Sequence, residues 1–467
     1  MAEGFSEDQR AIPHPFAGYL TLTEVYMIID WPELQGGLVF EDAGDEMYRL
    51  ICELYPICRS VTGNGVRKTL EIIGRYIPVE LHEVPTGTQV FDWTVPKEWN
   101  IQDAYVKNSR GEKVIDFQAS NLHVLNYSVP VHRKMSLAEL RGHLFSSPDY
   151  PDSIPYRTSY FKDNWGFCMS HTQYEALEED EYEVVIDSSL EDGHLTLGEC
   201  LLKGETNAEV LISTHICHPS LANDNLSGVA LTTFLAHKLA GRPRRYSYRF
   251  LFVPGTIGPI AWLCLNHDKT VNISHGLVVA CVGDAGRMTY KKTRRGDTEL
   301  DKAVEYVLKH SGEAYEIVEF SPYGYDERQF CSPGFNLAVG CLMRTPYGRY
   351  PQYHTSSDDL DFVRPEYLAD SFAKYWTVLD LLEHNNTYVN QNPKCEPQLG
   401  KRGLYGTIGG QTHAKTFELA LLWVLNLSDD HHSLLDIAER SGLDFRAIKC
   451  AADALANHNL LKESERG

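Results

Sequence analysis

The segment AEVLISTHICHPSLANDNLSGVALTTFLAHKLA, residues 208–240, decides the fold class. Its first seven residues form a short, mostly apolar run, which predicts a buried parallel strand. Residues 227–240 carry apolar side chains at helical spacing, which predicts a helix. His215, His218 and Asp224 fall between them, on a strand-to-helix loop. Open parallel sheets bind ligands at the carboxyl ends of their strands. The segment therefore predicts an α/β fold with a polar site at one sheet edge.

The flanking sequence continues the alternation of strands and helices. Further strand candidates are residues 246–253, 276–282, 314–320 and 336–343, with helices between them and at 365–384. This pattern is typical of a parallel or mixed sheet with helices on both faces. Two helices within residues 45–77 belong to the same unit. We therefore expect an α/β domain formed by residues 45–79 and 186–392.

Three other segments have residue patterns that differ from this alternation of strands and helices. Residues 80–185 contain short alternations of apolar and polar residues separated by Gly, Asn and Pro, which predicts an inserted, mostly β domain. Residues 400–467 read as helix, turn and helix, the pattern of a winged-helix domain. Residues 1–44 are mixed, and we expect an N-terminal extension with partial order.

Composition limits the function classes. The formal net charge is −21, which disfavours nonspecific binding to nucleic acid or anionic membranes. The eleven cysteines form no CxxC pair, so reduced thiols are expected. We find neither a secretory signal nor an apolar run approaching the roughly 18 residues that span a bilayer. We expect a soluble cytoplasmic protein without membrane partners, with a homo-oligomer among the open options.

Four residues near ends of predicted strands are of metal-ligand types: His215, Asp224, Asp284 and His354. Imidazole together with carboxylate suits Zn²⁺, and a bridging carboxylate suits a pair of ions. Such sites polarise a carbonyl and provide a nucleophile near neutral pH, which is the chemistry of amide hydrolysis. The competing interpretation is a purely structural turn with an Asx hydrogen bond.

Five strings together indicate a family resemblance: IPYRTSYFKDNWGFC (154–168), THICHPSLANDNLSG (214–228), FVPGTIGPIAWL (252–263), DERQFCSPGFNL (326–337) and YHTSSDDLDFV (353–363). They resemble the zinc-dependent aminopeptidases of the glutamate carboxypeptidase and bacterial leucyl aminopeptidase clan. The resemblance is closer to a bacterial subgroup with an inserted β domain and a C-terminal winged helix, and it covers most of residues 45–467. It implies an aminopeptidase-like mixed sheet flanked by helices.

The resemblance also implies roles for the four candidate ligands. His215 matches the first histidine ligand, Asp224 the bridging aspartate and Asp284 the aspartate that completes the first metal's set. His354 matches the histidine that holds the second metal. The implied cofactor is one or two zinc ions.

One departure from the family concerns the general base. The family has two adjacent glutamates where this chain reads Pro254-Gly255-Thr256, and a glycine cannot accept a proton. Glu327 is our tentative replacement base. His218 is a second candidate for that role and an additional candidate ligand.

Several other features have bland interpretations that we prefer. Asp358 and Asp359 are expected to cap a loop or hydrogen-bond the histidine before them. An aromatic group is expected to pack between domains rather than to form a substrate wall; it consists of Tyr156, Tyr160, Phe161, Trp165 and Phe167. Residues 400–467 hold eight Lys or Arg against nine Asp or Glu, so nucleic acid is an improbable partner for the winged helix.

The function that these observations favour is metal-dependent hydrolysis of an amide bond in a small peptide or aminoacyl conjugate. A second hypothesis is an amidase or deacetylase acting on an amino-sugar or secondary metabolite. A third is a non-catalytic homologue that binds metal or ligand, with a winged helix for protein interaction or DNA binding. The substitution at Gly255 is the best argument for the third hypothesis.

Overall fold

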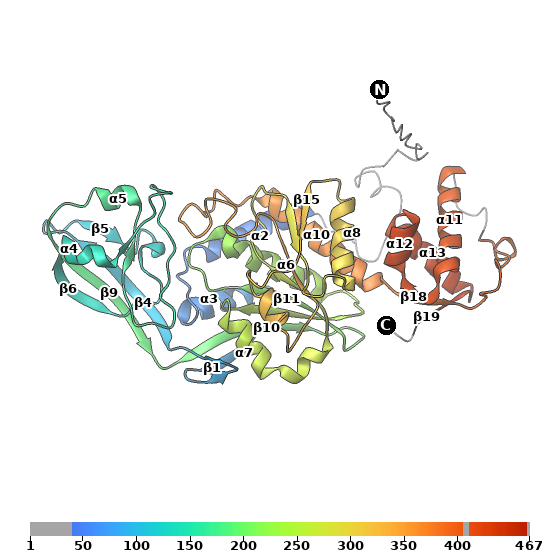
Figure 1. The fold of residues 1–467 in the computed structure, drawn as a ribbon, viewed down its shortest axis with the longest axis horizontal. Helices are drawn as coiled ribbons and strands as arrows, with labels where there is room; N and C mark the ends of the chain where they lie inside the picture. Colours follow the sequence, from blue (N-terminus) through green and yellow to red (C-terminus); the bar gives the residue numbers. More distant parts are fainter. Residues whose placement is uncertain (1–39, 405–410, 465–467) are drawn as a thin grey trace, which may run out of the picture.

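The computed structural model describes residues 40–404 and 411–464. An inserted β unit lies at one end of an elongated molecule, the α/β unit in the middle and the winged helix at the other end (Figure 1). The predicted α/β fold class with these two additions is confirmed. Residues 1–39 of the predicted N-terminal extension lie outside the described residues, whereas residues 40–44 begin helix α2 (Phe40–Leu54).

The α/β unit is built on an eight-stranded mixed sheet with the order β1-β10-β12-β11-β13-β16-β14-β15. Its centre is parallel and consists of β12 (Ser247–Val253), β11 (Glu209–His215), β13 (Ile273–Val279) and β16 (Val339–Met343). The outer strands are β1 (Glu80–Pro85), β10 (His194–Leu202), β14 (Met288–Lys291) and β15 (Tyr315–Val318). The central strands match the predicted ones within a few residues.

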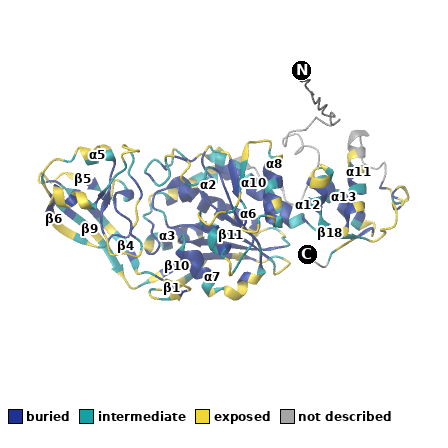
Figure 2. Cartoon of the chain, in the orientation of Figure 1, coloured by how far each residue is buried: buried dark blue, intermediate teal, exposed yellow. Residues whose placement is uncertain are grey.

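Both faces of strand β11 are buried, which explains its continuous apolar sequence. Val210 and Ile212 pack in one core with α2, α6 (Gly228–Ala240) and α10 (Pro365–His384). Leu211 packs in the other core, with α7 (Ile257–Leu265). Figure 2 shows this buried centre. Helices α3 (Asn64–Ile73) and α8 (Glu299–His310) contribute to the same core as Val210 and Ile212.

The inserted unit contains a four-stranded antiparallel sheet with the order β5-β4-β9-β6. Its strands are β4 (Glu98–Lys107), β5 (Lys113–Asp116), β6 (Val131–Ser136) and β9 (Glu181–Glu191). The edges differ from the predicted range 80–185, because β1 pairs with β10 in the large sheet and β9 runs past residue 185. Alternation identifies a strand, but it does not say which sheet the strand joins.

The winged helix comprises α11 (Gln411–Leu427), α12 (Leu434–Ser441) and α13 (Phe445–Asn457). Its small sheet has the order β18-β17-β19, with β17 (Thr387–Asn390), β18 (Asp429–Ser433) and β19 (Leu461–Glu463). The unit packs directly on α8. The backbone N–H of Phe445 donates to Tyr306 Oη at 2.9 Å, and Lys302 pairs with Asp436 at 2.8 Å.

Candidate metal centre

Three potential metal ligands converge at the carboxyl end of β11. His215 is the last residue of the strand, His218 lies in the loop that follows, and Asp224 lies in the turn before α6. Each offers a ligand atom within 4.8 Å of the others. His215 Nε2 is 3.0 Å from Asp224 Oδ1, and His218 Nδ1 is 3.9 Å from the same oxygen.

His354 approaches Asp224 from the other side. It lies in the loop before α10, and its Nε2 is 2.9 Å from Asp224 Oδ2. The two atoms are not aligned for a hydrogen bond. The structure thus brings together His215, Asp224 and His354 of the predicted ligands, and it adds His218, the predicted extra ligand.

Unsatisfied buried atoms show that this donor set suits a cation. Among the described residues, His218 Nδ1, Asp224 Oδ2 and His354 Nε2 are buried and have no hydrogen-bond partner. Buried polar atoms normally find partners, and an unmodelled ion is one explanation for exceptions. Two imidazoles and a carboxylate, with ligand atoms within 4.8 Å of one another, are a donor set that suits Zn²⁺ with one open position.

The electrostatics keep the ligands in their binding forms. Burial lowers the pKa of His218 well below its ordinary value, which leaves the imidazole neutral. Burial alone would raise the pKa of Asp224, but His218 and the hydrogen bond from His215 outweigh it and hold this pKa well below its usual range. Metal ligation requires these two forms, a neutral imidazole and a carboxylate.

Asp358 holds the backbone of the Asp224 turn. Its carboxylate oxygens accept the N–H groups of Asn223 and Asp224 at 2.6 and 2.9 Å. Burial raises the pKa of Asp358 to about 8, although these two hydrogen bonds oppose the shift. Asp358 therefore caps a loop, as expected, but the loop it caps is the one that carries Asp224.

Asp284, the remaining predicted ligand, does not join these residues. Its oxygens accept hydrogen bonds from Asn223 Nδ2 at 3.0 Å, Gly286 N at 2.7 Å and Thr345 Oγ1 at 2.5 Å. The residue that lies beside the site after β13 is Cys281, which the sequence analysis did not single out. Burial, with a further contribution from the charge of Asp224, raises the pKa of its thiol well above the ordinary value.

The tentative base Glu327 also lies away from the cavity lining. Its side chain is fully buried and pairs with Lys291 Nζ at 2.7 Å. The adjacent Asp326 lines the cavity instead, together with the histidines. Asp326 Oδ1 accepts the N–H of Thr256 at 2.8 Å, so this carboxylate reaches the segment where the resemblance implied a glutamate. Burial raises its pKa to about 6.

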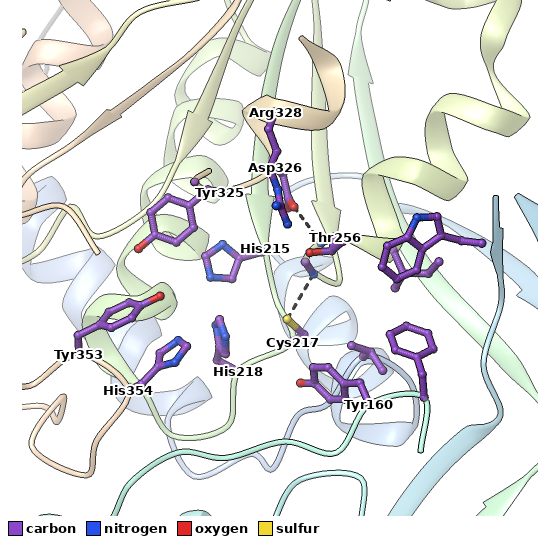
Figure 3. Close-up of a pocket in the computed structure, with 16 residues that line it drawn as sticks. Tyr160, His215, Cys217, His218, Thr256, Tyr325, Asp326, Arg328, Tyr353 and His354 are labelled. Carbon is purple, nitrogen blue, oxygen red and sulfur yellow. Dashed lines mark hydrogen bonds between the residues drawn. The ribbon is translucent and has the colours of Figure 1, made fainter. Parts of the chain in front are cut away.

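A cavity of about 370 Å³ opens over the three histidines. Figure 3 shows His215, His218 and His354 gathered on one side of it, with Asp326 and Arg328 approaching from the start of α9 (Glu327–Phe330). Of the predicted packing aromatics, Tyr160 and Phe161 line this cavity. The others, Tyr156, Trp165 and Phe167, are buried as expected. The volume of the cavity is within the range of small-molecule binding sites.

Residues 48–385 match the model of a family described as a domain of unknown function, DUF4910, and residues 386–463 match a winged helix-turn-helix model. The chain belongs to the DUF4910 family. The chain is 59% identical, over 90% of its length and 97% of the relative's, to a *Clostridium acetobutylicum* protein. The provisional name of that protein is a polysaccharide biosynthesis protein with an aminopeptidase-like domain.

Solved structures place the DUF4910 chain among aminopeptidase folds. A *Clostridium acetobutylicum* protein provisionally called a peptidase has a TM-score of 0.86 and 57% identity, covering 91% of this chain and 97% of that one. A zinc aminopeptidase from *Bacillus subtilis* has a TM-score of 0.52 and 13% identity, covering 72% and 94%. A peptidase M28 precursor from *Shewanella amazonensis* has a TM-score of 0.51 and 13% identity, covering 74% and 96%.

These likenesses confirm the aminopeptidase-like fold and the C-terminal winged helix of the DUF4910 chain. The zinc aminopeptidase and the M28 precursor are each 13% identical to this chain, so their likeness establishes the fold and nothing more. No helix in the described part of the chain is long and apolar enough to cross a membrane.

Proposed function

We propose that this protein is a metal-dependent hydrolase that cleaves an amide bond in a small peptide or aminoacyl conjugate. The observation that carries the proposal is the group of His215, His218 and Asp224 beside His354, with unsatisfied buried ligand atoms, whose three histidines line a substrate-sized cavity. A purely structural role would leave three buried polar atoms without partners, which folded proteins avoid.

The chain's own residues divide the work. His215, His218 and Asp224 would hold one zinc ion. His354, whose Nε2 lies beside the second oxygen of Asp224, would be a further ligand on that side. When bound, zinc supplies a Lewis acid for the amide carbonyl and lowers the pKa of water. Asp326 accepts the proton of the attacking water, because one of its oxygens is anchored by Thr256 and the other has no donor among the described residues.

Asp326 then returns this proton to the departing amine, as a general base that becomes a general acid. A carboxyl group with a pKa of about 6 is suited to both steps near neutral pH. Tyr160, Cys217 and Ile257 wall the cavity and exclude part of the water.

A second candidate is an amidase or deacetylase acting on an amino-sugar. Two observations favour it: the provisional name of the *Clostridium acetobutylicum* relative refers to polysaccharide biosynthesis, and Trp93 and Phe161 stand half-exposed in the cavity wall. The two candidates share the site and differ only in the group attached to the amide.

A panel of aminoacyl amides, dipeptides and N-acetylated amino-sugars tests the function. We expect zinc-loaded protein to hydrolyse at least one class, and His215→Ala to abolish turnover. Ser356→Ala is the matched control and should keep the activity, because the Ser356 hydroxyl accepts a hydrogen bond from the Ile154 backbone N–H. Turnover that survives His215→Ala or exhaustive chelation would exclude the proposed mechanism.

A further inference from the structure

Arg328 is the one permanently charged cation among the described residues that line the cavity. The structure gives it neither a hydrogen bond nor an ion pair within the described residues, and its Nε atom is buried without a partner. Two other buried arginines make hydrogen bonds within the described residues. The buried Arg59 and Arg249 donate to a carbonyl and to a carboxylate at 2.8 and 2.6 Å.

Neither of the two acidic residues that precede Arg328 forms an ion pair with it within the described residues. Asp326 shares its wall of the cavity but directs Oδ1 to Thr256 N, and Glu327 is committed to Lys291. A guanidinium presents its donors in a planar fork that matches carboxylate and phosphate oxygens. An unpartnered fork beside the metal-ligand residues is therefore suited to an anionic group on the substrate.

Another part of the cavity wall is aromatic and comes from the inserted unit. Trp93, on strand β3 (Trp93–Thr94), and Phe161 have ring centroids 5.5 Å apart, and they are 38% and 48% exposed. Exposed aromatic rings at a cavity commonly mark a contact surface for a ligand. The cavity thus combines a cation and an apolar platform.

We propose that Arg328 binds an oxyanion of the substrate, a carboxylate or a phosphate, while Trp93 and Phe161 pack against its apolar part. The proposed function supplies the scissile amide, on which this assignment of the substrate class rests, but binding of the oxyanion itself needs neither zinc nor turnover. The substrate class is an acidic amide with an apolar or ring-shaped group.

Calorimetric titration with a matched pair of probes tests the proposal. Hippurate carries an aromatic ring, an amide and a carboxylate, whereas hippuramide replaces the carboxylate with a neutral amide. We expect the full-length protein to bind hippurate at least about tenfold more tightly, as a charge-assisted bidentate contact predicts. The phosphonate analogue of hippurate, titrated in parallel, distinguishes a phosphoryl source from a carboxylate source, according to which of the two binds more tightly through Arg328.

Variants test whether Arg328 causes the difference in affinity between hippurate and hippuramide. Arg328→Gln should bring the two affinities within about twofold, and Arg328→Lys should keep part of the difference because it keeps the charge. Arg349→Gln removes an exposed arginine that pairs with Glu316 outside the cavity, and it should leave the contrast unchanged. Trp93→Ala should weaken both probes equally.

Titrations of zinc-loaded and chelator-treated protein separate this proposal from the proposed function. A contrast that persists without zinc and disappears in Arg328→Gln supports the anion site, even if no hydrolysis is found. A contrast that requires zinc and survives Arg328→Gln means that the metal binds the carboxylate, which overturns the proposal. Equal affinities in the unmodified protein, or no binding of either probe, overturn it as well.

Discussion

At the residue scale, the Asp326 carboxylate accepts a hydrogen bond from Thr256, in the segment where the family resemblance implied a glutamate, and we propose that it acts as the general base. Thr256 adopts a positive φ of 65°, which is an outlier for a β-branched residue, and it turns its N–H to the Asp326 carboxylate. Strained backbone of this kind persists where the surrounding structure holds it, and it concentrates at functional sites. A carboxylate from a different loop thus contacts the segment where the resemblance implied a glutamate.

Asp326→Asn should lower kcat by about 10²- to 10⁴-fold, the usual contribution of a general base, and leave the zinc content unchanged. With a pKa of about 6, Asp326 loses its proton as the pH rises through that value, so the rate should rise with pH through about 6 and level off above it. A bound cation favours the carboxylate and moves this limb to lower pH. Steady-state rates from pH 4 to 9 measure both effects.

Gly255 offers a rescue experiment. A Cβ added there would meet Cys217 Sγ at 3.5 Å and His215 Cβ at 3.7 Å, which are ordinary contacts. Gly255→Glu in the Asp326→Asn background should therefore recover part of the rate. Full activity of Asp326→Asn alone would show that another group takes the proton.

The candidate site was predictable where ligands lie close to one strand end. His215 ends β11, His218 and Asp224 follow it before α6, and the structure brings all three together. In the structure, Asp284 and Glu327 lie apart from these three residues. Asp284 folds back onto Thr345, and Glu327 pairs with Lys291 on β14, a strand too short and polar to be recognised.

At the element scale, a buried ion cluster joins three neighbouring strands. Arg249 of β12 pairs with Glu209 of β11 at 2.6 Å and with Glu199 of β10, whose second oxygen accepts Trp262 Nε1 at 2.7 Å. This cluster ties the antiparallel edge of the sheet to its parallel centre. A buried charge without its partner lowers the stability of the fold. Arg249 therefore stabilises the buried carboxylates of both glutamates.

Arg249→Met should lower the free energy of unfolding by about 3–5 kcal/mol, because two carboxylates would remain buried without a counter-charge. Urea unfolding followed by circular dichroism measures the loss. Arg349→Gln, which breaks an exposed pair with Glu316, should cost about 0–1 kcal/mol. Equal effects of the two substitutions would contradict this account of the sheet.

Elements were predictable in proportion to their burial. The central strands β11, β12, β13 and β16 are apolar because helices cover both faces, and the sequence shows it. Strand β1 has the mostly polar sequence ELHEVP, in which only Val84 is buried, and it joins the large sheet by pairing with β10. Such long-range pairing leaves no local signal.

At the scale of the whole molecule, the winged helix is docked on the α/β unit. Helix α13 follows the turn after α12 and so takes the place of a recognition helix, whose N-terminal residues read bases in helix-turn-helix proteins. Here the N-terminus of α13 lies on α8, since Phe445 is bonded to Tyr306 and buried. Lys449 on this helix pairs with Asp453 at 2.6 Å.

We therefore expect no specific DNA binding by the full-length chain. Fluorescence polarisation with a library of labelled duplexes at physiological salt should give no complex near the Kd of about 10⁻⁸ M or tighter that specific readers reach. A sequence-dependent complex in that range would show that α13 leaves α8 or that another surface reads DNA.

The central claim is a single zinc ion held by His215, His218 and Asp224, and metal content measures it most directly. Elemental analysis of protein loaded with zinc and then desalted should give about one zinc per chain, and His218→Ala should lose most of it. His218 is decisive because the resemblance assigns it no role, whereas the structure places its unsatisfied Nδ1 beside Asp224. Zinc content that is zero, or that His218→Ala leaves unchanged, would contradict the account.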